Sequence, residues 1–252
     1  IPTCDRPDFL HEAIASIRAQ NLQPIEIIVA NNGKEPLPEG SLGDDVKILS
    51  LEPYVGVSAA RNAGAEAAKG DYLAFLDDDD KWDEDFLKHL AAKMTHANAD
   101  YVAADRYYFS EKEEPWLHKS FTHYPKGTKT CFFGKNPGLG GGSFMVSKKA
   151  FFAVGGFDKN LTLSEDQALA CALMLAGYTI VGEAKAKCYV RVHTQPRLTN
   201  YKTPKRKNTF YNDYMKFYYK FKQHMTLKQR VLYVFKGWKK VIKHKIRSVL
   251  KF

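Results

Sequence analysis

Four consecutive aspartates, Asp77 to Asp80, are the residues of this sequence that most directly suggest chemistry. They follow the apolar run at residues 72–76, which predicts a buried strand that delivers them to one edge of a sheet. Adjacent carboxylates repel one another, so a bound cation is an attractive explanation for the run. Mg²⁺ and Mn²⁺ take few protein carboxylates and complete their shells with phosphate oxygens and water. The run therefore predicts a metal site for a phosphate-bearing ligand, although acidic runs are also typical of solvated turns.

The elements that position this run alternate along the first half of the chain. Strand patterns are predicted at 25–30, 46–51, 72–76 and 101–108, and helical patterns at 9–19, 58–69 and 82–98. Such alternation is typical of βα units, so we expect an α/β fold with a doubly wound, mostly parallel sheet flanked by helices. Ligands of such sheets bind beyond the carboxyl ends of the strands. Polar residues gather at these ends: Cys4, Asp5, Arg6, Asn31, Asn32 and the acidic run.

The second half of the chain is less regular. A Gly-rich stretch at 138–142 precedes a predicted strand at 143–147, a helix at 165–176 and two short strands at 179–182 and 188–192. Its glycines let the backbone approach a ligand closely, or else form a flexible loop. Two helix caps are also predicted: Ser58 for the helix at 58–69, and a capping box from Ser164 to Gln167 for the helix at 165–176.

Basic residues concentrate at the end of the chain. The net charge is +10, yet residues 201–252 hold 16 Lys and Arg against one acid, Asp213, so the preceding part is mildly acidic. From residue 227 onward apolar side chains recur at spacings of three and four among lysines, which predicts an amphipathic basic helix. We expect this tail to dock on an anionic membrane surface or, as the alternative, to pack on the domain. No nucleic-acid partner is expected, because no recognisable nucleic-acid module accompanies the basic residues.

The cysteine pattern and the hydropathy of the sequence indicate the cellular compartment in which we expect the protein. The four cysteines form no CxxC pair, which argues against a zinc site and a disulfide framework and favours a reducing compartment. The sequence shows neither an apolar run long enough to span a bilayer nor a signal-peptide pattern. We therefore expect a cytoplasmic protein, attached peripherally to the inner face of the membrane.

Five blocks of the sequence resemble the inverting family 2 glycosyltransferases of the GT-A fold. IPTCDRP is similar to the family's opening IPTYNRP, and EIIVANNG resembles its EIIVVDDGS. GVSAARNAGAEAAKGDYLAFLDDDD is similar to GxSxARNxGIxxAxGxYIxFLDxDD, while GGSFMVSKKAFFAVGGFD and SEDQALACALMLAGY resemble the Gly-rich acceptor-side strand and the ED helix. The resemblance implies a GT-A catalytic domain at 1–200, with a nucleotide-binding half at about 1–110 and an acceptor half at about 111–200. A basic helical tail at 201–252 follows it.

By this resemblance, one group of residues binds the nucleotide-sugar donor. Arg61 is expected to reach the nucleotide or its phosphates, whose oxygens a guanidinium can grip with two donors at once; a solvent-facing helix arginine is the alternative. Asn31 stands where the family usually has an aspartate that reads the uracil edge, so UDP is the default and other bases stay open. Asp79 aligns with the ligand of Mn²⁺ or Mg²⁺, and Asp80 is expected to support it or to cap the following helix. The other donor-side residues are Thr3, Asp5, Arg6, Asp77 and Asp78.

A second group is implied on the acceptor side. Asp166 matches the base that takes the proton from the acceptor hydroxyl, and the first turn of a helix favours an ionised carboxylate. Glu165 is expected to orient the acceptor or Asp166, and Gly141 and Gly142 to bring the backbone near a ligand. Three further residues are expected near the diphosphate: His193 as a possible metal contact, and Arg191 and Arg197 as neutralising charges.

The sequence thus predicts a metal-dependent, inverting glycosyltransferase that moves a sugar from a nucleotide-diphosphate donor to a glycan or lipid-linked acceptor. Two other classes stay open: a non-catalytic nucleotide or glycan binder on the same scaffold, and a nucleic-acid protein driven by the basic tail. A nucleotidyltransferase could also use the acidic run, but the ED helix would then lack a purpose. The donor sugar, the acceptor and the linkage depend on loop shapes that the sequence does not specify.

Overall fold

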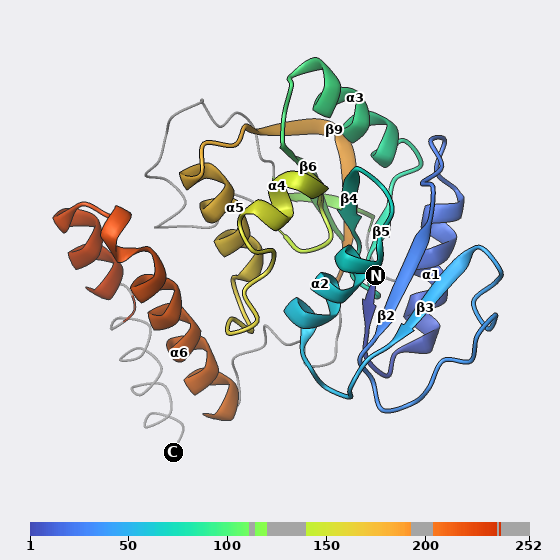
Figure 1. Ribbon diagram of the computed structural model, residues 1–252, viewed down its shortest axis with the longest axis horizontal. Coiled ribbons are helices and arrows are strands. Elements are labelled where there is room, and N and C mark those ends of the chain that lie inside the picture. Colours follow the sequence, from blue (N-terminus) through green and yellow to red (C-terminus); the bar gives the residue numbers. More distant parts are fainter. Residues whose placement is uncertain (111–113, 120–139, 193–203, 236, 238–252) are drawn as a thin grey trace.

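The computed structural model describes residues 1–110, 114–119, 140–192, 204–235 and 237. Within them the chain forms a mixed α/β fold in which strands occupy the middle and helices lie on both sides (Figure 1). The first sheet is parallel and has the strand order β1-β2-β3. Its strands are β1 (Pro2–Thr3), β2 (Ile27–Asn31) and β3 (Val46–Ser50).

A second, mixed sheet lies beside the first. Its strands are β4 (Tyr72–Phe75), β5 (Lys81–Trp82), β6 (Tyr101–Phe109), β7 (Trp116–Lys119), β8 (Phe144–Ser147) and β9 (Ile180–Arg191). Their order is β4-β8-β6-β9-β5, and β7 pairs with β6. Only β6 and β9 run parallel in this part of the described chain. The predicted α/β class is confirmed, with the parallel pairing concentrated in the first sheet and in the β6–β9 pair.

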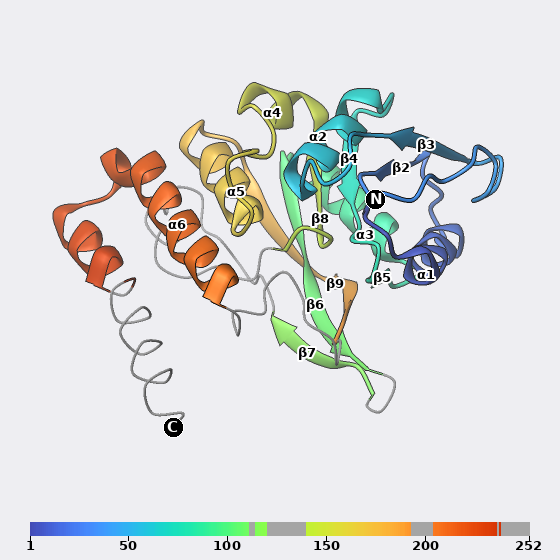
Figure 2. The same cartoon turned by 90° about the horizontal axis from the view of Figure 1, so that it is seen from below.

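Two hydrophobic cores lie on opposite faces of the strands. Figure 2 shows helices α2 (Val57–Ala67), α4 (Lys148–Ala153) and α5 (Glu165–Leu175) on one side, and α1 (Pro7–Arg18) and α3 (Phe86–His96) on the other. The apolar stripes of α1 and α3 pack together with residues of β2, β6 and β9 in one core. The other core contains an aromatic cluster of Phe75, Phe144, Phe151 and Phe157. Burial on both faces explains why the strands read as continuous apolar runs.

The described part of the basic tail packs on this second core. It consists of α6 (Pro204–Phe221), a 3₁₀ turn (Lys222–His224) and a helical segment at 227–235. Phe217, Phe221, Met225 and Tyr233 are buried against residues of α5 and its neighbours. Of the two alternatives expected for the tail, packing on the domain holds for these four residues. None of the helices among the described residues combines the length and the hydropathy needed to cross a bilayer.

Two element boundaries predicted from the sequence were wrong. The helix expected at 82–98 begins only at Phe86, because Lys81 and Trp82 instead pair with Tyr189 and Cys188 of β9. The two short strands expected at 179–182 and 188–192 belong to one strand, β9. Its register against β6 shifts between Ala104 and Asp105, so the two predicted strands correspond to the two regular stretches on either side of an irregularity.

Both predicted helix caps were also wrong. The N-cap of α2 is Gly56, and the Ser58 hydroxyl instead donates to the Leu161 carbonyl at 3.2 Å. Ser164 precedes α5 with a left-handed backbone (φ +64°), and its side chain makes no capping hydrogen bond. The capping box fails because it requires an N-cap residue in the extended region and a side chain directed at the helix N–H groups.

Candidate active site

The carboxyl edge of the first strands carries a cluster of one exposed arginine, one buried aspartate and one partly buried aspartate. Arg6 Nη2 lies 2.6 Å from Asp78 Oδ1, and Arg6 Nη1 donates to Asp79 Oδ2 at 2.8 Å. Thr3, at the end of β1, donates its hydroxyl to Asp78 Oδ2 at 2.8 Å. Burial raises the pKa of Asp78 to about 6 although Arg6 acts against this shift. The structure thus brings together four of the residues expected on the donor side.

Asp5 and Asn31 build the loop beside this cluster. Asp5 has a left-handed backbone, and its Oδ1 accepts from the N–H groups of Lys34 and Glu35 at 2.8 and 3.1 Å. These bonds, led by the one from Glu35, lower the pKa of Asp5. Asn31 accepts from the Gly33 N–H and donates to the Glu35 carbonyl, both at 2.9 Å. Both side chains therefore stabilise the turn at 31–35, and base recognition by Asn31 stays a prediction.

Arg61, on α2, lies between the acidic run and the start of α5. Its Nη2 is 2.5 Å from Asp77 Oδ1, and its Nη1 is 2.8 Å from Glu165 Oε1. The Phe157 ring centroid lies 5.2 Å from its guanidinium carbon. The Arg61 side chain is 3% exposed, whereas those of Asp77 and Glu165 are 32% and 12% exposed. One buried cation thus joins a carboxylate of the donor side to a carboxylate of the acceptor side.

The Gly-rich stretch before β8 packs directly on charged groups of the site. A Cβ added at Gly141 would lie 2.0 Å from Arg61 Nη2, and one at Gly140 would lie 2.7 Å from Arg106 Cζ. A Cβ at Gly142 would lie 3.0 Å from the Asp77 nitrogen. A larger residue at these positions would force a guanidinium group or the backbone of the acidic run to shift, because the backbone approaches them closely. Contact of Gly141 and Gly142 with a ligand stays a prediction.

Glu165 and Asp166 begin α5 in a buried environment. Burial raises the pKa of Glu165 from 4.5 to about 7; the charge of Asp166 adds to this shift and Arg61 opposes it. Burial also raises the pKa of Asp166. Three groups oppose this shift: the Gln167 N–H, which donates to Asp166 Oδ1 at 2.6 Å, and the charges of Arg106 and Arg61. Carboxylates whose pKa values move toward neutrality are suited to accept a proton during catalysis. The pair therefore has the electrostatics of a general-base site.

Arg106, on β6, is a residue of this site that the sequence did not reveal. Its guanidinium packs on Gly140, and its charge lowers the pKa of Asp77 and of Asp166. The registers of β6 against β9 and β7 both shift near this position, and a bulge changes the face on which the following residues lie. The available signal was the charged pair of Asp105 and Arg106 inside an otherwise apolar strand.

Arg191, the last residue of β9, braces the acidic run. Its N–H donates to Asp80 Oδ1 at 2.9 Å, and its Nε donates to the Asp79 carbonyl at 3.1 Å. Its Nη2 is 2.6 Å from Glu12 Oε2 on α1. Asp80 is thus held by the Arg191 backbone, and both the support of a metal ligand by Asp80 and the contact of Arg191 with a diphosphate stay predictions. The other two expected residues, His193 and Arg197, lie outside the described residues.

The acidic run could bind a divalent cation because its side chains offer carboxylate oxygens, the ligands that such cations prefer. Asp79 and Asp77 offer carboxylate oxygens at the sheet edge, and both side chains are partly exposed. Among the described residues, no three His, Cys, Asp or Glu side chains are grouped as a closed ligand set. Mg²⁺ usually needs no such set, because one or two carboxylates suffice when substrate phosphates and water complete its shell. The residues therefore fit a cation shared with a bound diphosphate.

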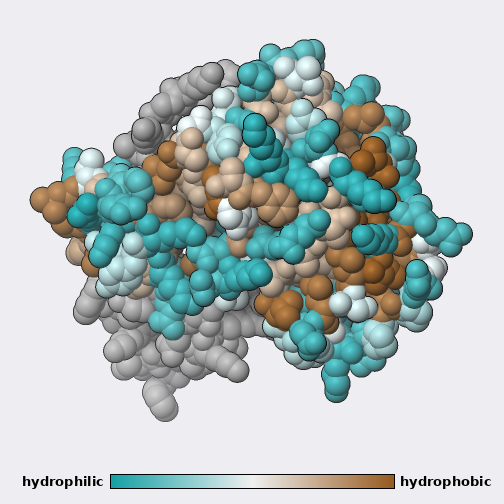
Figure 3. Space-filling view, in the orientation of Figure 1, coloured by the Kyte–Doolittle hydropathy of each residue, from teal (hydrophilic) through white to brown (hydrophobic). Residues whose placement is uncertain are grey.

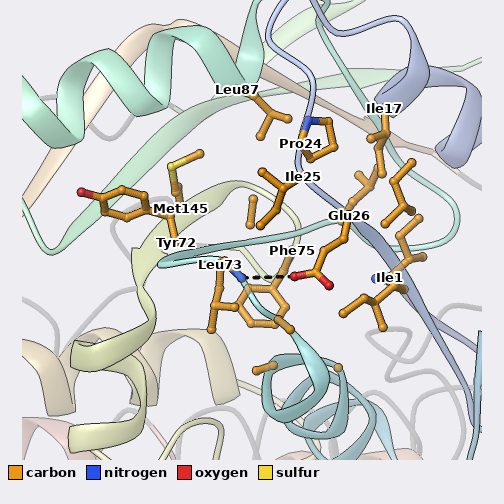
Figure 4. Close-up of a pocket in the computed structure, with 18 of the residues that line it drawn as sticks. Ile1, Ile17, Pro24, Ile25, Glu26, Tyr72, Leu73, Phe75, Leu87 and Met145 are labelled. Carbon is orange, nitrogen blue, oxygen red and sulfur yellow. Dashed lines mark hydrogen bonds between the residues drawn. The ribbon is translucent and has the colours of Figure 1, made fainter. Parts of the chain in front are cut away.

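A cavity of about 460 Å³ opens between the amino-terminal ends of β2 and β4 (Figure 4). Its walls are mainly apolar and include Ile25, Leu73 and Met145. Glu26, which also lines it, accepts from the N–H groups of Lys69 and Gly70 at 2.5 and 3.2 Å. Apolar walls do not suit a diphosphate, so the candidate active site is the charged carboxyl edge and not this cavity.

Several bacterial proteins named as glycosyltransferases resemble this chain. It is 34% identical over 132 residues to the uncharacterized glycosyltransferase YwdF of Bacillus subtilis (strain 168), covering 51% of this chain and 47% of YwdF. It is 24% identical over 187 residues to the putative teichuronic acid biosynthesis glycosyltransferase TuaG of the same strain, covering 72% of this chain and 73% of TuaG. Over 118 residues it is 31% identical to the glycosyltransferase GlyA of Streptococcus pneumoniae serotype 4, covering 45% of this chain and 17% of GlyA. The chain thus spans about half the length of YwdF and much less of GlyA.

Solved structures show the same fold. The crystal structure of S. aureus TarS 1–349 in complex with UDP-GlcNAc matches with a TM-score of 0.66 and 17% sequence identity, over 86% of this chain and 63% of that chain. A sequence profile described as glycosyl transferase family 2 matches residues 1–154, which is more than half of this chain. Strands, site geometry and profile agree, and the chain belongs to glycosyl transferase family 2.

Proposed function

We propose that this chain transfers a sugar from a nucleotide-diphosphate sugar, by default a UDP-sugar, to an acceptor hydroxyl with inversion at the anomeric carbon. The observation that carries the proposal is that donor-side Asp77 and acceptor-side Glu165 meet on one buried arginine, Arg61. A reaction between two substrates needs the groups that hold each of them to be adjacent. Family membership and the UDP-GlcNAc complex of TarS support the donor class.

In the proposed reaction Asp166 is the general base. The acceptor oxygen attacks the anomeric carbon from the face opposite the diphosphate, and its proton passes to the Asp166 carboxylate. The bond between the anomeric carbon and the diphosphate oxygen breaks, and the diphosphate leaves with the bonding electrons, so the configuration inverts. Arg106 and Arg61 favour the ionised form of Asp166 that this step requires. Glu165 orients the acceptor or Asp166 from the preceding position.

The donor side supplies binding and charge. Thr3, Arg6 and Asp78 form the rim against which the nucleotide lies, with Asp77 beside them. Asp79 would hold Mn²⁺ or Mg²⁺, which would supply positive charge to the leaving diphosphate. The partly exposed Asp79 side chain is accessible to such an ion.

The proposed acceptor is a glycan or a lipid-linked saccharide, reached at the inner face of an anionic membrane. The helical segment 227–235 combines basic residues, Lys228 and Arg230, with exposed apolar side chains, and Figure 3 shows hydrophobic surface at this outer end of the molecule. Amphipathic basic helices bind such interfaces through both features. The exposed apolar residues are Leu227, Val231, Leu232 and Phe235.

Vesicle binding tests this partner. The whole chain is expected to co-sediment with phosphatidylcholine vesicles that contain phosphatidylglycerol and much less with phosphatidylcholine alone. Serine at Leu227, Val231 and Phe235 should weaken the binding, because these apolar side chains are exposed. Equal sedimentation of both proteins with both vesicles would contradict the membrane assignment while leaving the transferase proposal intact.

Donor binding and turnover test the reaction. Thermal unfolding is followed with UDP, GDP, dTDP and their common sugars, with and without Mn²⁺, and nucleotide release is measured with the same donors. We expect at least one donor to stabilise the chain only when Mn²⁺ is present, and wild type to release its nucleotide. Absence of metal-dependent stabilisation by every nucleotide would count against the donor site. Stabilisation without any turnover, over a panel of acceptors, would favour the non-catalytic alternative.

A further inference from the structure

We infer that Arg61 is a positioning residue, which holds the acceptor-side carboxylates of α5 in place relative to Asp77 and does not itself bind the donor phosphates. The inference rests on the proposed function, in which Asp166 is the base. It differs from the role implied by family resemblance, in which this arginine reaches the nucleotide. Three features of the structure lead to it: the exposure of the cluster, the docking of α2, and the close approach of Gly141.

The exposure of the side chains of Arg61, Asp77 and Glu165 determines which of them a ligand can contact. Both terminal nitrogens of Arg61 already pair with carboxylates, at 2.5 Å with Asp77 and 2.8 Å with Glu165. The side chain of Arg61 is almost wholly buried, while Asp77 is about one third exposed. A ligand that approaches from solvent therefore contacts Asp77 before Arg61. Arg61 acts on that ligand through the carboxylates that it fixes.

The helix that carries Arg61 also fixes the segment leading to α5. Ser58 donates to the Leu161 carbonyl at 3.2 Å. Asn62 Nδ2 donates to the Phe157 carbonyl at 2.8 Å, and its Oδ1 accepts from the Phe157 N–H at 2.9 Å. These bonds hold the backbone of 157–161 against α2, and the ion pair with Glu165 continues the same attachment. A single helix thus sets the place at which α5 begins.

Two neighbours pack directly against the terminal nitrogens and the face of the guanidinium. Gly141 packs so closely that an added Cβ would lie 2.0 Å from Arg61 Nη2. The Phe157 ring covers the guanidinium at 5.2 Å from its carbon atom. A phosphate that bound Arg61 directly would have to displace one carboxylate or the backbone of Gly141. Leaving a carboxylate buried without its cation is costly, so this exchange is disfavoured.

Charged groups reach Glu165 and Asp166 from each element around them. Arg61 comes from α2, Asp77 from the end of β4, and Arg106 and the Tyr101 hydroxyl from β6. Arg61 lowers the pKa of both carboxylates, against their burial. Its removal should therefore raise both pKa values, and the base should become protonated at a higher pH than in wild type. A residue that only supports the fold would not have this effect.

The first test measures kcat and KM between pH 5 and 9 with whichever nucleotide sugar the wild type turns over. In Arg61→Gln the acid limb of the kcat profile should move up by about one pH unit, and kcat at pH 7 should fall about 100-fold. Arg61→Lys keeps the charge but reaches one carboxylate at a time, so its acid limb should stay near that of wild type. Asn62→Ala is the matched control, because Asn62 is buried, neutral and attached to the same segment. Its profile should fall without moving along the pH axis.

The outcomes separate this inference from the proposed function. A fall in kcat for Arg61→Gln that is equal at every pH, as in the control, would overturn the positioning role. A rise in KM for the donor at unchanged kcat would instead make Arg61 a donor ligand. Failure of the wild type to turn over any donor counts against the proposed function.

The second test needs no turnover and follows thermal unfolding of Arg61→Gln, Glu165→Gln and the double variant at pH 8. The two substitutions should be strongly non-additive, with the second restoring part of the stability lost in the first, because an unpaired buried carboxylate is removed. Additive losses would overturn the inference even if the enzyme proved inactive. Arg61→Lys, tested in the same way, covers the case in which Arg61→Gln does not fold.

Discussion

Two arginines hold carboxylates at this site, and they differ most in their surroundings. Arg6 pairs with Asp78 and Asp79 from a side chain that is 42% exposed, whereas Arg61 pairs with Asp77 and Glu165 from one that is 3% exposed. Exposed ion pairs contribute about 0–1 kcal/mol and are screened by salt. A buried charge that loses its partner costs about 3–5 kcal/mol. Asp78 is itself 1% exposed, so the low cost applies to the pair with the partly exposed Asp79: Arg6 can give up that partner more easily than Arg61 can give up either of its own.

This difference assigns separate tasks to the two halves of the site. The donor edge has to admit and release a nucleotide and a cation in every cycle, which suits the exposed guanidinium of Arg6 and its pair with the partly exposed Asp79. The acceptor side has to keep a base in one position, which suits a buried arginine fixed by two carboxylates and a ring. Changes in the Arg61 cluster should therefore affect the chemical step, and changes in the Arg6 cluster should affect ligand binding.

The largest expected effect is that of Asp166→Asn. It removes the proposed base while keeping the shape of the side chain, so kcat should fall about 1,000-fold. Donor binding should persist, because the Arg6 cluster is unchanged; the metal-dependent thermal shift with the donor nucleotide measures this. Full turnover by a normally folded Asp166→Asn protein would remove the base assignment. Loss of both turnover and donor binding would show that the two clusters are not separate.

The next effect concerns the dependence of stability on pH. The pKa of Glu165 is raised from 4.5 to about 7 in the folded protein, so the folded state holds a proton that the unfolded state has already released in this range. The free energy of unfolding should therefore fall by about 2 kcal/mol as pH rises from 5 to 8. Glu165→Gln, which cannot ionise, should show a smaller decline. Urea unfolding at each pH measures it, and parallel curves for the two proteins would contradict the raised pKa.

Gly141→Ala should disturb the buried cluster without changing any charge. The added Cβ would lie 2.0 Å from Arg61 Nη2, so the guanidinium or the backbone must move. We expect a loss of about 1–3 kcal/mol in the free energy of unfolding and about a tenfold fall in kcat. Gly64→Ala is the control: it lies on the same helix as Arg61, and a Cβ there meets nothing within 4 Å. That variant should gain about 0.5–1 kcal/mol.

Much of this arrangement could be predicted from local patterns. The apolar runs before Asn31 and Asp77 form β2 and β4, and the acidic run that follows β4 contacts Thr3 and Arg6 after β1, as expected of residues beyond the carboxyl ends of strands. The elements on either side of the site were located within a few residues for the same reason. Periodicity reports burial, and burial determines most of the fold.

The partners of the charged residues could not be predicted in this way. The sequence identified Arg61, but its contact with Glu165 spans 104 positions and depends on how α2 docks on the segment before α5. Arg106 was missed because register shifts in β6 and its partners break the two-residue alternation that assigns side chains to faces. Ser164 appeared to be a cap because side-chain types were visible and its left-handed backbone was not.

The smallest effect, and the sharpest test of the comparison, concerns Arg6. A cation that binds Asp79 in the absence of nucleotide competes with Arg6 for the same oxygen, which accepts from Arg6 Nη1 at 2.8 Å. Arg6→Gln should therefore raise the affinity for Mn²⁺ alone, by up to about fivefold, the equivalent of one exposed ion pair. Electron paramagnetic resonance of free Mn²⁺ measures this directly. Arg18→Gln removes an ion pair with Asp45 that is made by an arginine of similar exposure, far from the acidic run in sequence, and should leave the affinity unchanged. If Arg6→Gln binds Mn²⁺ no better than Arg18→Gln does, Arg6 is not the exchangeable partner of Asp79. The donor edge would then not be the adaptable side of the site that the comparison with the acceptor side requires.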